Sequence, residues 1–135
     1  MRLAFPLRIG ALAALLLLMA EFAVAVERDG RAKIDFDREI RPILSEYCFT
    51  CHGPDKNMLQ AGLRLDRPDS VFGATESGKI AVVPGSLESS ELIRRITTND
   101  VDEAMPPSDA AKHLSPAQIQ LLQRWVEQGA RWSDH

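Results

Sequence analysis

The sequence contains few cysteines and histidines, the side chains that most often bind zinc and other transition-metal ions or, for cysteine, form cross-links. Two cysteines and three histidines occur in 135 residues. Two cysteines exclude a small scaffold held by several disulfides and a zinc site built from four thiolates. Two of the histidines, His113 and His135, show no paired spacing that would complete a zinc site with the cysteines. Metal chemistry therefore depends on the short segment that holds the remaining residues.

Strong charge is also lacking, and aromatic residues make up only 6% of the chain. The net charge is −3, so we predict no nucleic-acid partner. A chain of this length has room for one domain with a limited core. Low aromatic content fits a small domain whose largest planar group is a cofactor rather than a side chain.

Long apolar runs are absent except at the N-terminus. Arg2 and Arg8 precede the almost wholly apolar residues 9–20, and Ala-Val-Ala at 23–25 is typical of a cleavage site. The apolar run of about a dozen residues is short for a membrane span. We therefore predict a signal peptide over 1–25, export to the periplasm or an equivalent compartment, and membrane attachment only if the signal is not cleaved.

Both cysteines fall in one motif, Cys48-Phe49-Thr50-Cys51-His52. On a helical turn the side chains of Cys48, Cys51 and His52 share one face. Two thiols at this spacing can bond the two vinyl groups of a haem, and the following imidazole can bind its iron. The motif predicts one covalent haem c. Export supports this prediction because such haems are attached outside the cytoplasm. A haem-free thiol-disulfide pair remains an alternative, although no βαβ pattern surrounds the motif.

A methionine in a stiff loop is a candidate for the second iron ligand. Met105 precedes two prolines in the predicted loop 99–108. A thioether is a soft, neutral ligand that raises the reduction potential relative to a second imidazole. Met58 is a competitor that follows the motif closely, and His113 is a more serious one because paired imidazole ligands are common.

Periodicity predicts an all-α fold of about four helices around the covalent haem. The first helix is expected over about 38–48, capped by Asp35 or Asp37, with Pro42 in its first turn or at a kink. Three further helices, and one extended piece without a sheet, are expected. The extended piece is 78–83. The helices are 66–71, capped by Asp66, and about 90–97, capped by Ser89, followed by a final helix. The final helix has Ser115 as N-cap, Pro116 at N1, Gln118 completing a capping box and Gly129 at its end.

These motifs in this order resemble the Planctomycete-type cytochrome C domain, over about residues 36–132. The resemblance rests on Ile40-x-Pro42-Ile43-Leu44, Cys48-x-x-Cys51-His52-Gly53-Pro54, Gly62-Leu63-Arg64-Leu65-Asp66, Pro84-Gly85, Ser89 and Ser90 with Leu92 and Arg95-Ile96, Met105-Pro106-Pro107, Leu114-Ser115, Trp125, Gly129-Ala130 and Trp132. It implies a cytochrome c-like fold, thioether bonds from both cysteines, His52 as proximal ligand and Met105 as distal ligand.

The predicted organisation is a signal peptide (1–25), a linker (26–35), a cytochrome c-like domain (36–132) and a tail (133–135). The predicted function is an exported mono-haem cytochrome, an electron carrier rather than an enzyme, that exchanges single electrons with redox partner proteins. Arg64 is a candidate for pairing with a haem propionate. A haem enzyme or gas sensor with a labile distal ligand stays an alternative. Members of the family are commonly N-terminal modules of longer proteins, so both a free-standing cytochrome and a module with further domains remain open.

Overall fold

The computed structural model describes residues 32–133, so the predicted signal peptide, most of the linker and the end of the tail lie outside it. From Ile34 onward the residues form one compact unit. Within the described part the structure is helical and has no strand, which confirms the all-α class. Its elements are the π-helix η1 (Phe36–Ile40) and the α-helices α2 (Arg41–Tyr47), α3 (Phe49–His52), α4 (Pro68–Val71), α5 (Glu91–Thr97) and α6 (Pro116–Glu127).

The first helix starts earlier than the predicted residue 38 and changes type before the proline. Asp35 is the N-cap, and its carboxylate accepts hydrogen bonds from the backbone N–H groups of Asp37 and Arg38. The N–H of Arg41 donates to the carbonyl of Phe36, which closes a π-helical turn. Pro42 then occupies the first turn of α2, where its missing N–H leaves no helical bond unmade. The wider turn explains why the helix begins ahead of the proline.

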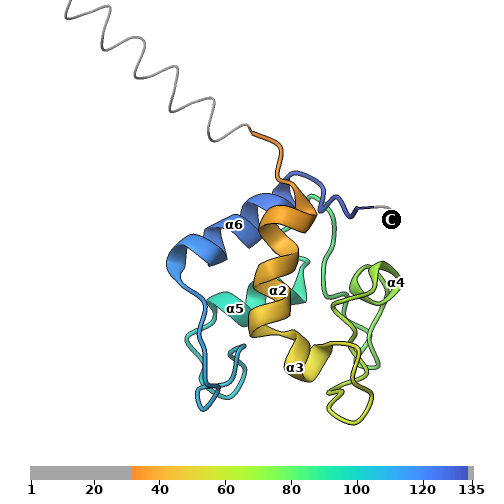
Figure 1. The fold of residues 1–135 in the computed structure, drawn as a ribbon, viewed down its shortest axis with the longest axis vertical. Coiled ribbons are helices and arrows are strands. Elements are labelled where there is room, and N and C mark those ends of the chain that lie inside the picture. The colour runs from red at the N-terminus through yellow and green to blue at the C-terminus, as the bar shows by residue number, and fades with distance from the viewer. Residues whose placement is uncertain (1–31, 134–135) are drawn as a thin grey trace, which may run out of the picture. The chain divides into compact units, whose positions relative to one another are not determined.

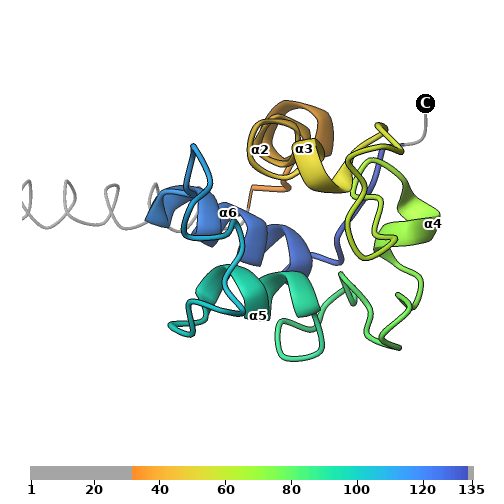
Figure 2. The ribbon, with the colours of Figure 1, turned by 90° about the horizontal axis from the view of Figure 1, so that it is seen from below.

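Helix α6 lies between two layers, the η1–α2 segment and α5. Figure 1 shows α6 crossing behind the η1–α2 segment, and Figure 2 shows α6 lying between α2 on one side and α5 on the other. Leu122, Trp125 and Val126 of α6 are fully buried in this position. Side chains from both outer layers join them in one core cluster, among them Ile40, Ile43, Leu44, Leu92, Ile93 and Ile96. The central helix thus fixes how α2 and α5 sit relative to each other.

The ends of α6 match the sequence prediction. The Ser115 hydroxyl accepts from the backbone N–H of Gln118, and the Gln118 side chain accepts from the N–H of Ser115. This capping box satisfies N–H groups that the first helical turn leaves without partners. Gly129, just beyond the helix, has φ +93°, a conformation that glycine adopts at low cost.

The C-terminal residues close over the first helix. The rings of Phe36 and Trp132 stack with centroids 4.0 Å apart, and Trp125 lies 5.7 Å from Phe36. Trp125 also donates its indole N–H to the carbonyl of Arg131. The final helix therefore packs on the first one at η1.

Two predicted caps are wrong. Helix α4 begins at Pro68 rather than Asp66, because the Asp66 carboxylate pairs with Arg64 instead of capping the helix. Helix α5 has Ser90, not Ser89, at its N-cap position, and Ser90 makes no capping bond. Its hydroxyl instead donates to the Ser86 carbonyl at 2.6 Å and accepts from the N–H of Val83. Between α4 and α5 the chain forms turns and two isolated bridges, so the extended piece predicted over 78–83 is not continuous.

No helix in residues 32–133 is both long enough and apolar enough to span a bilayer.

Replacing Ser90 with alanine should destabilise the domain by about 1–3 kcal/mol, because the fully buried Ser90 hydroxyl is the acceptor of the Val83 N–H. Chemical unfolding followed by circular dichroism measures the change. Ser89→Ala is the matched control, since the Ser89 hydroxyl is exposed and bonds only the neighbouring Ser86 hydroxyl. Equal stabilities of the two variants would contradict the role assigned to the Ser90 hydroxyl.

Candidate functional site

The cysteine motif forms a helical turn of its own. Cys48 lies between α2 and α3, and its carbonyl accepts hydrogen bonds from the N–H groups of Cys51 (3.2 Å) and His52 (2.8 Å). The predicted turn is therefore present, in a short separate helix rather than at the end of the first one. Residues at positions i, i+3 and i+4 of such a turn project from one face, so the two thiols and the imidazole are grouped.

The segment that follows the motif folds back and supports α3 from one side. The N–H of Gln60 donates to the Cys51 carbonyl at 2.9 Å, and the N–H of Leu65 donates to the His52 carbonyl at 2.8 Å. These bonds satisfy carbonyl groups that the end of a helix otherwise leaves unpaired. Residues 53–65 thus hold the end of α3, which carries His52, in place.

The His52 imidazole is held in its neutral form. Burial lowers its pKa below the usual range, while the backbone carbonyl groups of Leu63 and Gln60 act in the opposite direction. Its Nδ1 atom is buried and has no hydrogen-bond partner among the described residues. An unpaired buried nitrogen in a native fold points to a group that completes its surroundings. A neutral imidazole is also the form that binds iron.

The two thiols are unpaired, and they do not resemble a redox pair. Burial raises the pKa of the Cys48 thiol to about 12, so it stays protonated at neutral pH. A thiol-disulfide oxidoreductase needs the opposite shift at its attacking cysteine, because the thiolate is the nucleophile. A neutral, apolar setting is compatible with a sulfur bonded as a thioether.

Gly53 follows the motif where no larger residue fits. A Cβ at this position would lie 2.3 Å from the backbone oxygen of Phe49 and 2.7 Å from its Cβ. The chain leaves α3 in an extended conformation directly against the start of the same helix. The absence of a side chain therefore sets how tightly the chain leaves the turn. Nothing in the sequence alone indicates this close contact.

The predicted distal ligand lies on the other side of α3. Figures 1 and 2 show the loop between α5 and α6, which contains Met105, on one side of α3 and the 53–62 loop on the opposite side. The backbone N–H of Met105 donates to the carbonyl of Arg95 at 2.9 Å, which ties the residue to α5. Its side chain is 37% exposed.

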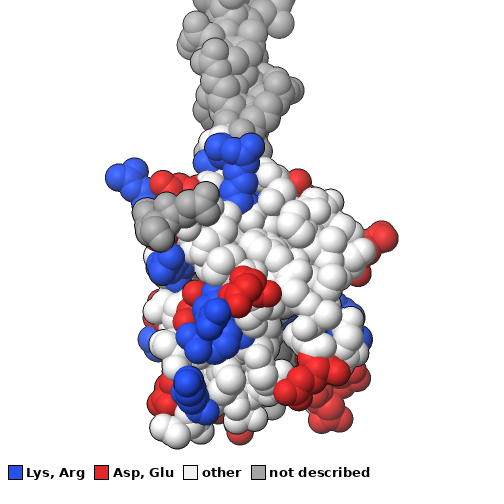
Figure 3. All heavy atoms as spheres, turned by 90° about the vertical axis from the view of Figure 1, so that its right-hand side faces the viewer, with Lys and Arg blue, Asp and Glu red and all other residues white. Residues whose placement is uncertain are grey.

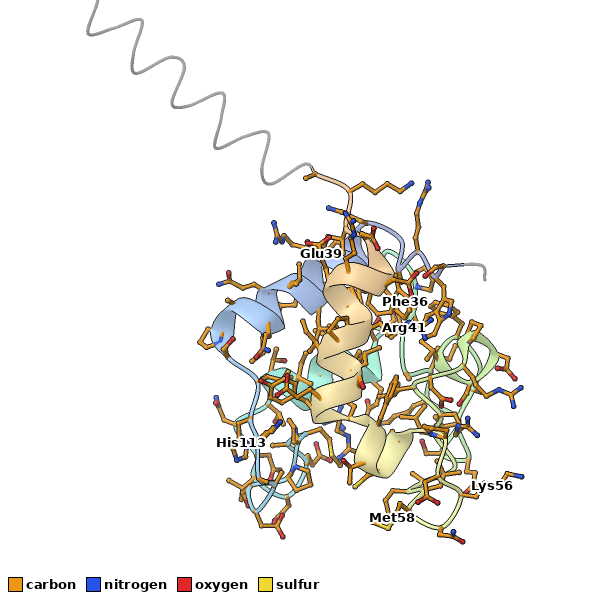
Figure 4. The ribbon with its side chains drawn as sticks, viewed as in Figure 1. Phe36, Glu39, Arg41, Lys56, Met58 and His113 are labelled. Carbon is orange, nitrogen blue, oxygen red and sulfur yellow. The ribbon has the colours of Figure 1, made fainter. Side chains whose placement is uncertain are left out.

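The two competitors differ in where they lie. In Figure 4, Met58 belongs to the loop that supports His52, and His113 belongs to the loop on the Met105 side. Met58 thus lies on the side of the proximal residue. His113 is exposed, as expected for a residue ahead of the α6 cap.

Arg64 is already paired within the protein. Its Nε and Nη2 atoms donate to the two carboxylate oxygens of Asp66 at 2.6 and 2.5 Å. This hydrogen bonding lowers the pKa of Asp66 below its usual range. A propionate bound by Arg64 would share the guanidinium with Asp66, a partner that sequence analysis did not foresee.

Charges are mixed on the face that Figure 3 shows, which is the right-hand side of Figure 1, where α4 lies. Basic and acidic side chains both occur there, separated by uncharged surface. Arg67 and Asp69 of this region form an exposed ion pair. This face therefore carries no field of one sign that would steer a strongly charged partner. In residues 32–133, no three histidine, cysteine or acidic side chains are grouped as for a metal ion.

A covalent haem fits the residues present. Two neutral thiols and a neutral imidazole with an unpaired nitrogen share one helical turn, and Tyr47, Phe49 and Leu63 pack beside it at the edge of the core. An attachment motif of this kind in an all-helical unit is typical of c-type cytochromes. Residues 48–109 match the family Planctomycete cytochrome C.

The match confirms the resemblance predicted from the sequence, over a shorter range than the predicted 36–132. It begins at the first cysteine and ends just after the loop that carries Met105. A cytochrome c domain implies haem c and is typical of haem-based electron carriers. No curated protein and no solved structure matches the chain.

Replacing Gly53 with alanine should reduce the fraction of protein that carries covalent haem, because the added Cβ forces Phe49 and α3 to shift. Gly78→Ala is the control, since it adds strain at φ +77° but meets no atom within 4 Å. A haem-stained denaturing gel, normalised to total protein, measures the fraction. The same haem content in both variants would show that the close contact at Gly53 does not matter for attachment.

Proposed function

We propose that this protein is an exported mono-haem cytochrome c that carries single electrons between partner proteins. Cys48 and Cys51 hold the haem through thioether bonds, His52 is the proximal ligand and Met105 is the distal ligand. The cofactor supplies the one-electron ferric–ferrous couple when bound. The reaction needs no side chain as acid or base, so the protein acts as a carrier rather than an enzyme.

The observation that carries the proposal is the placement of two loops on opposite sides of α3. Residues 53–65 support His52 through backbone hydrogen bonds to α3. The loop that carries Met105 lies on the other side of the helix. A histidine and a methionine presented from two sides can hold six-coordinate iron between them. This favours Met105 over Met58, which belongs to the loop on the histidine side.

Arg64 is proposed to bind a haem propionate while it stays paired with Asp66. The ion pair is partly buried, with 20% of the arginine side chain and 17% of the aspartate side chain exposed. The Arg64 guanidinium can donate from Nη1, which Asp66 does not use, to the carboxylate of a propionate.

A haem enzyme or gas sensor is the alternative function. Its distal ligand would leave the iron and open a site for a small molecule. The two functions differ in the resting protein. A carrier keeps the methionine bound in both oxidation states, and a sensor releases it.

The ferric protein should show a methionine–iron charge-transfer band near neutral pH, and Met105→Ala should remove it. The Met105→Ala variant should also have a lower reduction potential, and its ferrous form should bind carbon monoxide, because a coordination position opens. His113→Ala is the control and should keep the band. Absence of the band from wild-type protein, with carbon monoxide binding gained only in the ferrous His113→Ala variant, would make His113 the distal ligand.

Export and covalent attachment can be tested together on the mature protein. Mass spectrometry should find a chain that begins at Val26 and is heavier by one haem. Cys48→Ser combined with Cys51→Ser should remove the haem from denatured protein, because no thioether can form. A mature chain that retains residues 1–25 would contradict cleavage, and a wild-type chain without haem would support the thiol-disulfide alternative.

A further inference from the structure

The loop that carries Met105 is held by few apolar contacts. Val101 is 68% exposed, and the loop contributes no residue to the buried core. Its internal hydrogen bonds are short-range, from Glu103 and Ala104 back to the carbonyl of Asp100. Apolar contacts with the rest of the protein therefore contribute little to the position of this loop, and its polar contacts matter more.

A group of charged side chains joins the loop to α5. Arg94 pairs with Glu91 on its own helix through Nη2 at 2.6 Å, and with Glu103 of the loop through Nη1. Arg95 donates from Nε to Glu91 at 2.8 Å and from Nη1 to the backbone carbonyl of Glu103 at 3.1 Å. We call Glu91, Arg94, Arg95 and Glu103 the loop clamp.

The loop clamp acts two residues from the proposed ligand. Glu103 is held through both its side chain and its carbonyl, and the N–H of Met105 donates to the carbonyl of Arg95. Helix α5 in turn is anchored by Leu92, Ile93 and Ile96 in the core. The backbone on both sides of Ala104 is thus tied to one rigid element.

The electrostatics of the clamp are favourable. Hydrogen bonds from Arg94, and then from Arg95 and Lys79, lower the pKa of Glu91 to about 2 despite its partial burial. Isolated surface ion pairs contribute little, but a carboxylate shared by two guanidinium groups forms a network in which each pair orients the next.

We propose that the loop clamp positions Met105 and so sets how firmly this side chain holds the haem iron. The inference rests on the proposed function, because it takes Met105 as the distal ligand. Glu103 and Arg94 are positioning residues: Glu103 belongs to the loop, Arg94 of α5 pairs with its carboxylate, and both act on the iron through Met105. Breaking the clamp should allow the loop to open more often, so an external ligand replaces the methionine more easily.

The test is imidazole binding to the ferric holoprotein. Glu103→Gln keeps the size of the side chain and removes its charge, and it should raise the affinity for imidazole about three- to tenfold. Asp69→Asn is the matched control, since it removes the charge of another carboxylate in an arginine pair, on α4. Its affinity should stay within about twofold of wild type. A merely structural role of Glu103 would lower unfolding stability and leave the affinity unchanged.

The salt dependence of imidazole binding gives a second test of the loop clamp. Raising the ionic strength from about 0.01 M to about 1 M shortens the screening length from about 30 Å to about 3 Å. The imidazole affinity of wild type and Asp69→Asn should rise with salt, and that of Glu103→Gln should rise less. A salt response that is the same in wild type and Glu103→Gln would overturn the inference.

The charge-transfer band separates failure of this inference from failure of the proposed function. Absence of the band from wild-type protein would overturn both the ligand assignment and the role of the clamp. If wild type shows the band and Met105→Ala loses it, the assignment stands. An affinity of Glu103→Gln equal to that of Asp69→Asn would then overturn the clamp alone.

Discussion

The three side chains of the attachment motif share a face only while the turn from Cys48 to His52 remains helical. A four-residue helix is too short to persist by its own hydrogen bonds, because the first turn of any helix costs more entropy than one bond returns. Here the turn is held from outside. Bonds from Gln60 and Leu65 tie up its carbonyl groups, and Gly53 lets the chain leave without colliding with Phe49. The placement of every candidate haem-binding group depends on this support.

Helix α6 links the two sides of the candidate site without contributing a ligand. It packs against η1 on one side and α5 on the other. The first helix leads into the cysteine motif, and α5 carries the bonds to the loop of Met105. A change in the packing of Trp125 would therefore shift both sides of the site together. This explains why the longest helix of the described part, which contains no candidate ligand, has a fully buried face.

Local signals in the sequence predicted local structure well. The capping box at Ser115, the glycine after α6 and the helical turn of the motif depend on neighbouring residues, so their spacing was sufficient. The wrong caps at Asp66 and Ser89 have a common cause. Asp66 pairs with Arg64, and the Ser90 hydroxyl beside Ser89 bonds to Ser86 and Val83; such side-chain contacts compete with capping. The loop clamp was missed for a related reason: Glu91, Arg94 and Arg95 have helical spacing, but nothing in the spacing indicates Glu103 as their partner.

The motif lies at the edge of the core rather than at its centre. Tyr47, Cys48, Phe49 and Leu63 pack against the buried cluster and are themselves only partly buried, whereas Trp125 and Val126 are fully enclosed. Helices η1, α5 and α6 thus form a packed core from side chains alone. A haem bonded to Cys48 and Cys51 would extend this core at its edge. Covalent attachment suits such a position, because a cofactor at the rim of a small core has fewer apolar contacts to retain it than one enclosed on all sides.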